Sequence, residues 1–316
     1  MPDEVSQKAI WAALDVGSNT VLMLIAEVSG SSVRPLSELL RITRLGRSVD
    51  QEGRLDPKAA ALTLAAIGEF VQQARGLGAQ KILAAGTAAL RDARNGEEFI
   101  EQVRRRAGVE LEIISGQAEA ELNFLAAVHG LRVDPAQPML IVDIGGGSTE
   151  LIRCEQGAPA AMASLQIGSV RLTERLIRHD PPTPDEQARI HETVREQLAR
   201  LGWKDFHPRR LIGVAGTVTT VAAVAIGLHS RDHSGVHGGQ LSAGQVAQTA
   251  RRFFSLTVEQ RKQLPGMIEG RADVICSGAA ILDCITQHFG VERVIVSNQG
   301  VRWGLIYREL GRPQRS

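Results

Sequence analysis

Residues 15–20 read DVGSNT, and residues 143–150 read DIGGGSTE. Each copy follows an apolar run and precedes another, IWAAL and VLMLIA for the first copy, MLIV and LIRC for the second. Each is therefore predicted to form two strands joined by a tight glycine turn, with an Asp at the end of the first strand. Because the pattern occurs once near the N-terminus and once near the middle, it predicts two related halves.

Both turns have the composition of a phosphate-binding loop. A glycine turn without bulky side chains lets backbone N–H groups approach phosphate oxygens closely. Asp15 and Asp143 each add a carboxylate that can hold Mg²⁺ directly or through water. Two such turns facing each other across a cleft would hold a polyanion together with its metal, which indicates phosphoryl chemistry. The loop residues are Gly17, Ser18, Asn19 and Thr20 in the first copy and Gly145, Gly146, Gly147 and Ser148 in the second.

The composition limits the classes of protein that remain. A chain of 316 residues, with 43% apolar and 22% charged residues, predicts a globular protein of two ordinary domains. Aromatic residues make up only 3%, which argues against recognition of nucleic acid by base stacking. A net charge of +1 means that any anion-binding surface is local.

The cysteines and the ends of the chain indicate a cytoplasmic protein. Cys154, Cys276 and Cys284 are odd in number and follow no metal-binding spacing, so they are expected to be reduced thiols. The N-terminal MPDEVSQKAI is polar and acidic, and no signal peptide is visible. Residues 211–228 carry no charge, but they favour a buried strand, a Gly216-Thr217 turn and a buried helix over a membrane span.

The remaining pattern alternates helix and strand. Asp56-Pro57 opens an amphipathic helix to about Arg75, with Pro57 at its first position. The plan restarts at Met139, so the sequence predicts an α/β fold of two domains, residues 1–130 and 131–301, with a helix at 302–316 as a candidate to rejoin the first. The other expected elements are strands at 33–40, 81–85, 111–114 and 293–297 and helices at 96–106 and 117–129, the last capped by Ser115.

The duplicated Asp-x-Gly loop resembles the superfamily of actin, sugar kinases and Hsp70-type ATPases. The two loops, together with GTAALRDARN (86–95), ISGQAEAEL (114–122), LPGMIEGRADVICSGAAIL (264–282) and SNQGVRWGL (297–305), resemble the exopolyphosphatase/guanosine pentaphosphate phosphohydrolase (Ppx/GppA) family. The resemblance runs from about residue 10 to 308. It implies two actin-like (ribonuclease H-like) domains with a cleft between them, in a short form without the C-terminal helical domain of longer members.

The resemblance also assigns the acids. Asp143 and Glu150 flank the GGG turn and are expected to coordinate Mg²⁺ (or Mn²⁺), with Asp15 as a further carboxylate near the metal. Glu119 and Glu121 both lie in the first turn of the helix after Ser115, where acids favour the helix dipole, so position alone does not choose between them. The family pattern Ser-Gly-x-x-Glu-Ala falls on residues 115–120, which makes Glu119 the expected general base and Glu121 a surface residue.

Cationic and turn residues complete the expected site. Arg91 has the fork geometry for a phosphate, and the alternative is a surface ion pair with Asp92 or another acid. Gly216 and Thr217 offer a third phosphate-side turn at a helix start, or plain turn chemistry. Arg302 is left open between a cleft cation and a domain-interface pair.

Two further patterns favour ordinary explanations. His229, His233 and His237 recur every fourth residue as in a helical metal site, but the surrounding HSRDHSGVHGG predicts a loop. Two groups of basic residues are expected to form solvated faces, and the alternative is that they form a track for a long anion. The groups are Arg34, Arg41, Arg44 and Arg47 in one segment and Arg104, Arg105 and Arg106 in another.

These features together predict a cytoplasmic, metal-dependent hydrolase that removes the terminal phosphate from inorganic polyphosphate or from guanosine pentaphosphate. The sequence does not choose between the two substrates. Alternatives are a kinase or ATPase of the same superfamily and a non-catalytic sensor of polyphosphate or a guanosine alarmone. No nucleic acid or membrane partner is expected. Members of the family often pair, so a homodimer is a further expectation, without an assigned interface.

Overall fold

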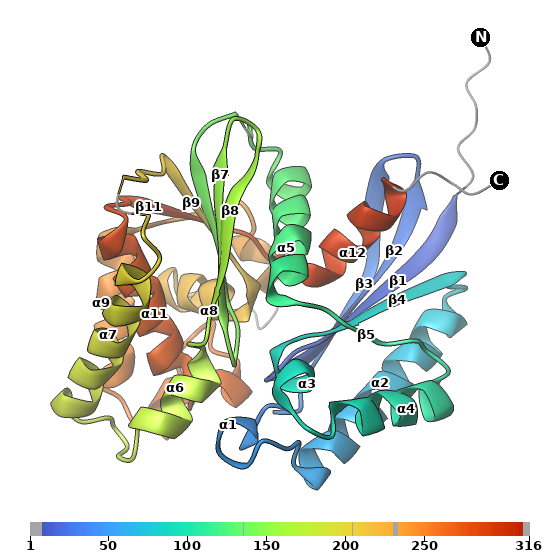
Figure 1. The fold of residues 1–316 in the computed structure, drawn as a ribbon, viewed down its shortest axis with the longest axis horizontal. Helices are drawn as coiled ribbons and strands as arrows, with labels where there is room; N and C mark the ends of the chain where they lie inside the picture. Colours follow the sequence, from blue (N-terminus) through green and yellow to red (C-terminus); the bar gives the residue numbers. More distant parts are fainter. Residues whose placement is uncertain (1–7, 135, 204, 230–232, 312–316) are drawn as a thin grey trace. The chain divides into compact units, whose positions relative to one another are not determined.

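A computed structural model describes residues 8–134, 136–203, 205–229 and 233–311 (Figure 1). The chain divides into two compact units. Unit 1 comprises the residues up to 126 together with those from 301 onward, and unit 2 comprises residues 127–300. Helix α5 (Gly116–Leu131) begins in unit 1 and ends in unit 2.

The sheet of unit 1 has the strand order β3-β2-β1-β4-β5. The first predicted hairpin is confirmed: β1 pairs antiparallel with β2 from Ala9↔Val28 to Val16↔Val21, and β2 pairs antiparallel with β3. β4 then runs parallel to β1, and β5 parallel to β4. The strands are β1 (Ala9–Val16), β2 (Thr20–Ser29), β3 (Ser32–Ile42), β4 (Lys81–Gly86) and β5 (Glu112–Ile113).

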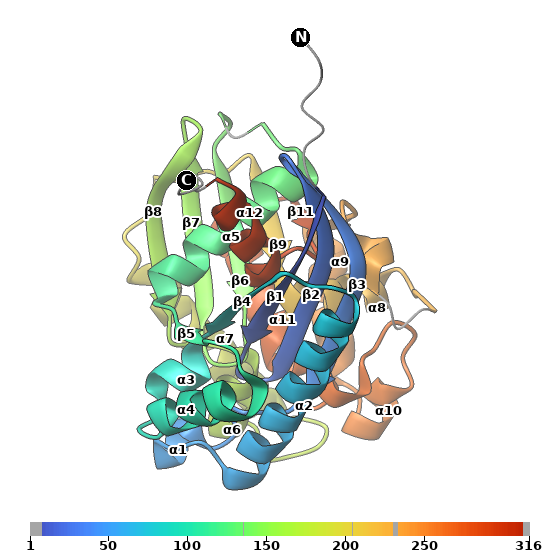
Figure 2. The same cartoon turned by 90° about the vertical axis from the view of Figure 1, so that its right-hand side faces the viewer.

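Helices cover both faces of this sheet (Figure 2). Because successive strand residues point to opposite faces, Leu14 of β1 packs into a cluster with Ile67 of α2 and Val103 of α4, whereas Ala13 packs with Leu122 of α5 and residues of α12. The helices of unit 1 besides α5 are α1 (Val49–Glu52), α2 (Pro57–Gly76), α3 (Ala88–Asp92), α4 (Gly96–Ala107) and α12 (Val301–Leu310).

The sheet of unit 2 repeats this plan with the strand order β10-β11-β9-β6-β7-β8. β6, β7 and β8 form an antiparallel triplet like β1, β2 and β3, and β9 runs parallel to β6 as β4 does to β1. The expected fold class of two related α/β domains is therefore confirmed. The strands are β6 (Met139–Ile144), β7 (Thr149–Glu155), β8 (Ala158–Leu165), β9 (Arg210–Val214), β10 (Gln240–Ser242) and β11 (Arg293–Val296).

Helices enclose the core of unit 2. α11 is buried along twelve consecutive residues from Ile275 to Thr286 and contacts α6, α7, α8 and α9. The helices are α6 (Ser169–Leu176), α7 (Pro184–Ala199), α8 (Ala215–Ala225), α9 (Ala243–Phe254), α10 (Val258–Lys262) and α11 (Ile275–His288), with 3₁₀ turns at His233–Val236 and Glu269–Arg271.

The uncharged segment 211–228 is a buried strand followed by a buried helix, as predicted. Leu211 and Ile212 of β9 are fully buried, and α8 lies in the same core. One detail differs from the prediction. Gly216 and Thr217 do not form a separate turn before the helix but lie in the first turn of α8. Ala215, the first residue of α8, has a left-handed φ of 64°, so the chain passes from strand to helix at this one residue. In the described part of the chain, no helix is long and apolar enough to cross a membrane.

The three cysteines are buried and free. Burial raises the pKa of the Cys154, Cys276 and Cys284 thiols to about 12. Their thiolate forms are therefore scarce at neutral pH, and the residues act as small apolar core side chains.

A charged capping box begins α7. Thr183 accepts a hydrogen bond from the Glu186 N–H, and the Glu186 carboxylate accepts from the backbone N–H groups of Thr183 and Arg178 and contacts His179 Nδ1 at 2.9 Å. Burial acts to raise the Glu186 pKa, but these hydrogen bonds outweigh it and lower the pKa to about 2.

Replacing Glu186 by Gln tests this cap. Because the pKa of Glu186 is lower in the folded chain than its ordinary 4.5, its stabilisation is complete above about pH 4.5 and is lost as the pH falls toward 2. We expect Glu186→Gln to lower the free energy of unfolding by about 1.5 kcal/mol near pH 7, with a difference that shrinks in acid. Denaturant unfolding of wild type and variant at several pH values measures this. Glu192→Gln, an exposed change in α7, is the control, and an equal loss at every pH would contradict the expectation.

Candidate active site

The second glycine loop connects β6 and β7 and presents two acids. The Gly145 N–H donates to Ser148 O over 3.0 Å, which closes the turn. The register then places Asp143 directly opposite Glu150, with both side chains on one face of the sheet. Asp143 is 6% exposed and Glu150 is 1% exposed. Two buried carboxylates are thus held side by side by the hairpin itself.

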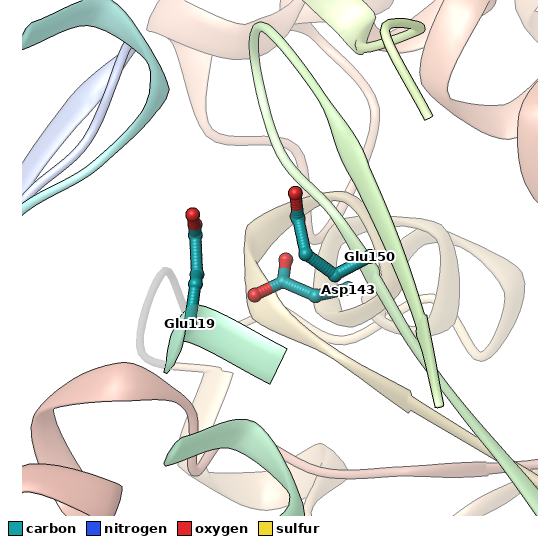
Figure 3. Close-up of side chains that lie close together, drawn as sticks. All are labelled: Glu119, Asp143 and Glu150. Carbon is teal, nitrogen blue, oxygen red and sulfur yellow. The ribbon is translucent and has the colours of Figure 1, made fainter. Parts of the chain in front are cut away.

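Glu119 on α5 completes a group of three acids. One carboxylate oxygen from each of Glu119, Asp143 and Glu150 lies within 4.8 Å of the other two (Figure 3). In the described part of the chain, no other group of His, Cys, Asp or Glu meets this spacing, so Asp15, His229 and His237 are not in such a group; the side chain of His233 lies outside the described residues. Hard oxygen donors at this spacing suit Mg²⁺ or Mn²⁺, because neighbouring carboxylates repel and a shared divalent cation removes the repulsion. The acidic cluster can therefore bind a metal ion.

Two helix starts hold the second loop in place. The Ser169 N–H donates to Gly145 O, and the Val170 N–H donates to Gly146 O, at the beginning of α6. A Cβ at Gly168 would overlap the Gly146 carbonyl, so only glycine allows this approach. From α8, the Thr217 hydroxyl donates to Ile144 O over 2.8 Å. Thr217 therefore supports the loop through its side chain. Its position in the sequence did not predict this contact.

Arg271 packs closely against Gly216 at the start of α8. The guanidinium of Arg271 lies against Gly216, where a Cβ would overlap it, and Nη1 donates to Gly216 O over 2.6 Å and to the Thr220 hydroxyl over 3.0 Å. Arg271 is 8% exposed. No local sequence pattern indicates this role, because the contact of Arg271 with the start of α8 joins segments 55 residues apart.

The first glycine loop, in unit 1, is held by residues 43–46, which no local sequence pattern indicates. The Gly17 N–H donates to Thr20 O, as in the second loop. In addition, the Thr43 and Arg44 N–H groups donate to Asn19 O, and the Gly46 N–H donates to Ser18 O. Ser18 and Thr20 are buried in consequence.

Asp15 lies at the end of β1, as predicted. Its neighbours in the register are Leu22 of β2 and Ala85 of β4. Its side chain is half-buried.

Arg91 and Glu119 meet in unit 1. Arg91, on the short helix α3, donates from Nη1 to Ile114 O over 3.0 Å and to Glu119 Oε2 over 3.5 Å. Its Nη2 is buried and has no hydrogen-bond partner among the described residues. A buried guanidinium nitrogen in that position fits an anionic oxygen of a ligand, since buried donors are nearly always satisfied. The sequence left the acidic partner of Arg91 open, and the structure shows that Arg91 contacts Glu119.

The two acids of the α5 start are distinguished by burial. Ser115 caps the helix by accepting the Ala118 N–H, as predicted. Glu119 is 7% exposed, whereas Glu121 is exposed and accepts a hydrogen bond from Gln117. This places Glu119 in the acidic cluster and Glu121 on the surface.

The remaining candidates lie elsewhere. Arg302 forms an ion pair with Glu38 inside unit 1. His237 contacts Gly130 O through Nε2 and accepts the Asn298 N–H at Nδ1. Four of the expected surface arginines form ion pairs: Arg34 contacts Glu27, Arg41 contacts Glu69, and Arg104 and Arg105 share Glu101.

Comparison with known proteins identifies the family of this chain. The model of the Ppx/GppA phosphatase family matches residues 24–313, so the chain is a member of that family. Exopolyphosphatase 2 of Mycobacterium tuberculosis is 34% identical over 309 residues, covering 93% of this chain and 96% of that protein. A putative exopolyphosphatase of Haemophilus influenzae is 27% identical and covers 94% and 90% of the two chains.

Solved structures of the family share the fold. The Aquifex aeolicus family member has a TM-score of 0.83 at 30% identity, covering 98% of this chain and all of the other. An exopolyphosphatase from Cytophaga hutchinsonii has a TM-score of 0.87 at 26% identity, covering 96% and 98%. The family resemblance inferred from the motifs is thereby confirmed, and the chain is a phosphatase of the Ppx/GppA class.

Replacing Gly168 by Ala tests the support of the second loop. The added methyl group meets backbone rather than a movable side chain, so we expect the free energy of unfolding to fall by about 2 kcal/mol. Gly68→Ala in α2 is the matched control, because a Cβ there meets open space and is expected to stabilise the helix by up to about 1 kcal/mol. Thermal and denaturant unfolding measure both, and an unchanged stability of Gly168→Ala would show that the loop is not tightly held.

Proposed function

We propose that this chain is a divalent-metal-dependent exopolyphosphatase, which hydrolyses the terminal phosphoanhydride bond of inorganic polyphosphate. The observation that carries the proposal is the group of buried carboxylates Glu119, Asp143 and Glu150, with Arg91 bonded to Glu119. Relatives named exopolyphosphatase support the choice of polyphosphate over other anhydrides.

The acids have different roles in the proposal. Asp143 and Glu150, fixed by the hairpin register, hold Mg²⁺ or Mn²⁺. A bound cation of this kind neutralises charge on the phosphoanhydride oxygens. Asp15, at the corresponding end of β1, is proposed as a further acid near the substrate, although it is not part of the acidic cluster.

Glu119 is proposed as the general base that orients and deprotonates the attacking water. Its contact with Arg91 holds the carboxylate in place beside the guanidinium that is proposed to bind the phosphoryl group. The buried Nη2 of Arg91 then binds an oxygen of the terminal phosphoryl group, and the N–H groups of the glycine loops bind others. Because the transition state of phosphoryl transfer is loose, positioning and charge stabilisation supply most of the rate enhancement.

Replacing Glu119 by Gln tests the base. We expect phosphate release from polyphosphate to fall by about 10²–10⁴-fold in kcat, while polyphosphate binding persists, because the change removes proton transfer and keeps the shape. Glu121→Gln, an exposed change two residues along α5, is the matched control and should leave the rate within about twofold. A Glu119→Gln variant with the wild-type rate would exclude Glu119 as the base.

Removing the metal tests the acidic cluster. Chelation with EDTA should abolish phosphate release, and added Mg²⁺ or Mn²⁺ should restore it in wild type. Asp143→Asn weakens one ligand, so we expect restoration to require at least about tenfold more metal. Full activity of the chelated wild-type protein would contradict a metal-dependent reaction.

A comparison of substrates separates the alternatives. Initial rates on short polyphosphate, long polyphosphate, guanosine pentaphosphate and ATP identify the preferred anhydride. Faster release from guanosine pentaphosphate would favour the 5′-phosphohydrolase activity, and release from none, with binding retained, would favour a sensor.

A further inference from the structure

Ser164 is in direct contact with one of the candidate metal ligands. It lies on β8, the edge strand of the unit 2 sheet, at the position directly opposite Glu150 in the register. Its hydroxyl donates a hydrogen bond to Glu150 Oε1 over 2.8 Å. Asp143, Glu150 and Ser164 therefore form one row across three neighbouring strands, on the same face of the sheet.

The surroundings of Ser164 make this hydroxyl distinctive. β8 reads APAAMASL, so Ser164 is its only side chain with a polar group. Ser164 itself is exposed, whereas Glu150 is 1% exposed. The hydroxyl of Ser164 is therefore a surface group whose hydrogen bond goes to a buried carboxylate.

The bond has a defined physical effect on the carboxylate. A glutamate side chain has three rotatable bonds, and a donor fixed on the neighbouring strand restricts their freedom before any ligand arrives. It occupies one lone pair of Oε1 and so directs the remaining lone pairs of the carboxylate. Outer groups that orient a metal ligand in this way typically change metal affinity by 10–100-fold.

We propose that Ser164 is a positioning residue for the metal site, which holds Glu150 in the orientation that binds the divalent cation. The proposal rests on the proposed function only in taking Glu150 as a metal ligand. Ser164 touches neither the metal nor the phosphate, and it acts through Glu150 alone.

A Thr/Val pair at position 164 tests this role. Both side chains are β-branched and suit an edge strand, but only Thr keeps the hydroxyl. Mn²⁺ affinity is measured by electron paramagnetic resonance without substrate, and the Mg²⁺ concentration for half-maximal phosphate release is measured separately. Ser164→Ala is the second hydroxyl-deleting variant, and Ser32→Ala, an exposed serine on edge strand β3, is the matched control.

We expect Ser164→Val and Ser164→Ala to weaken Mn²⁺ binding by about tenfold and to raise the half-maximal Mg²⁺ concentration to a similar extent. Saturating metal should restore most of kcat, and Ser164→Thr should stay within about threefold of wild type. Thermal unfolding shows whether each variant folds, and a structural role alone would lower the melting temperature without changing metal affinity.

Unchanged Mn²⁺ affinity in folded Ser164→Val and Ser164→Ala would overturn the proposal, as would a wild-type protein that binds no Mn²⁺. If wild type binds Mn²⁺ and the hydroxyl-deleting variants bind it more weakly, the positioning role is supported even when no substrate releases phosphate. That last outcome would contradict the proposed function and leave the role of Ser164 intact.

Discussion

The β6–β7 hairpin imposes the constraint on which the rest of the candidate site depends. Its register puts Asp143 opposite Glu150, both almost without solvent contact. Like charges directly across a strand pair destabilise a sheet, and burial increases the cost because the surroundings screen poorly. A divalent cation shared by the two carboxylates converts the repulsion into attraction. The arrangement is thus costly for folding and suited to metal binding, as is common at functional sites.

The surrounding contacts show how that local arrangement is kept. Gly168 brings the start of α6 onto the GGG loop, Thr217 bonds the start of α8 to β6, and Ser164 holds Glu150 from the other side. The left-handed Ala215 stores backbone strain of about 1 kcal/mol at the strand-to-helix junction beside this loop. Contacts from α6, α8 and β8 of unit 2 therefore meet at this loop and at Glu150 beside it.

The sequence predicted what local patterns encode. Both hairpins, the Pro57 helix start, the Ser115 cap and the buried strand and helix of 211–228 depend on neighbouring residues, and the structure confirms them. The contacts of Arg271 with Gly216 and of Arg302 with Glu38 join residues 55 and 264 positions apart, so no local pattern indicates them. Ser164 was missed for the same reason, since its partner is fixed by strand pairing. Gly216 and Thr217 lie at a helix start, as predicted, but inside the first turn of α8 and not in a separate turn before it, because the helix begins at Ala215.

Asp143 and Glu150 are proposed to hold a divalent cation together. Crystals grown with Mn²⁺ and phosphate, with diffraction data collected at the manganese absorption edge, test it without reference to activity. We expect an anomalous difference peak within metal-ligand distance of carboxylate oxygens of both Asp143 and Glu150. A peak bonded to neither residue, or no peak from crystals whose dissolved protein is active with Mn²⁺, would contradict it.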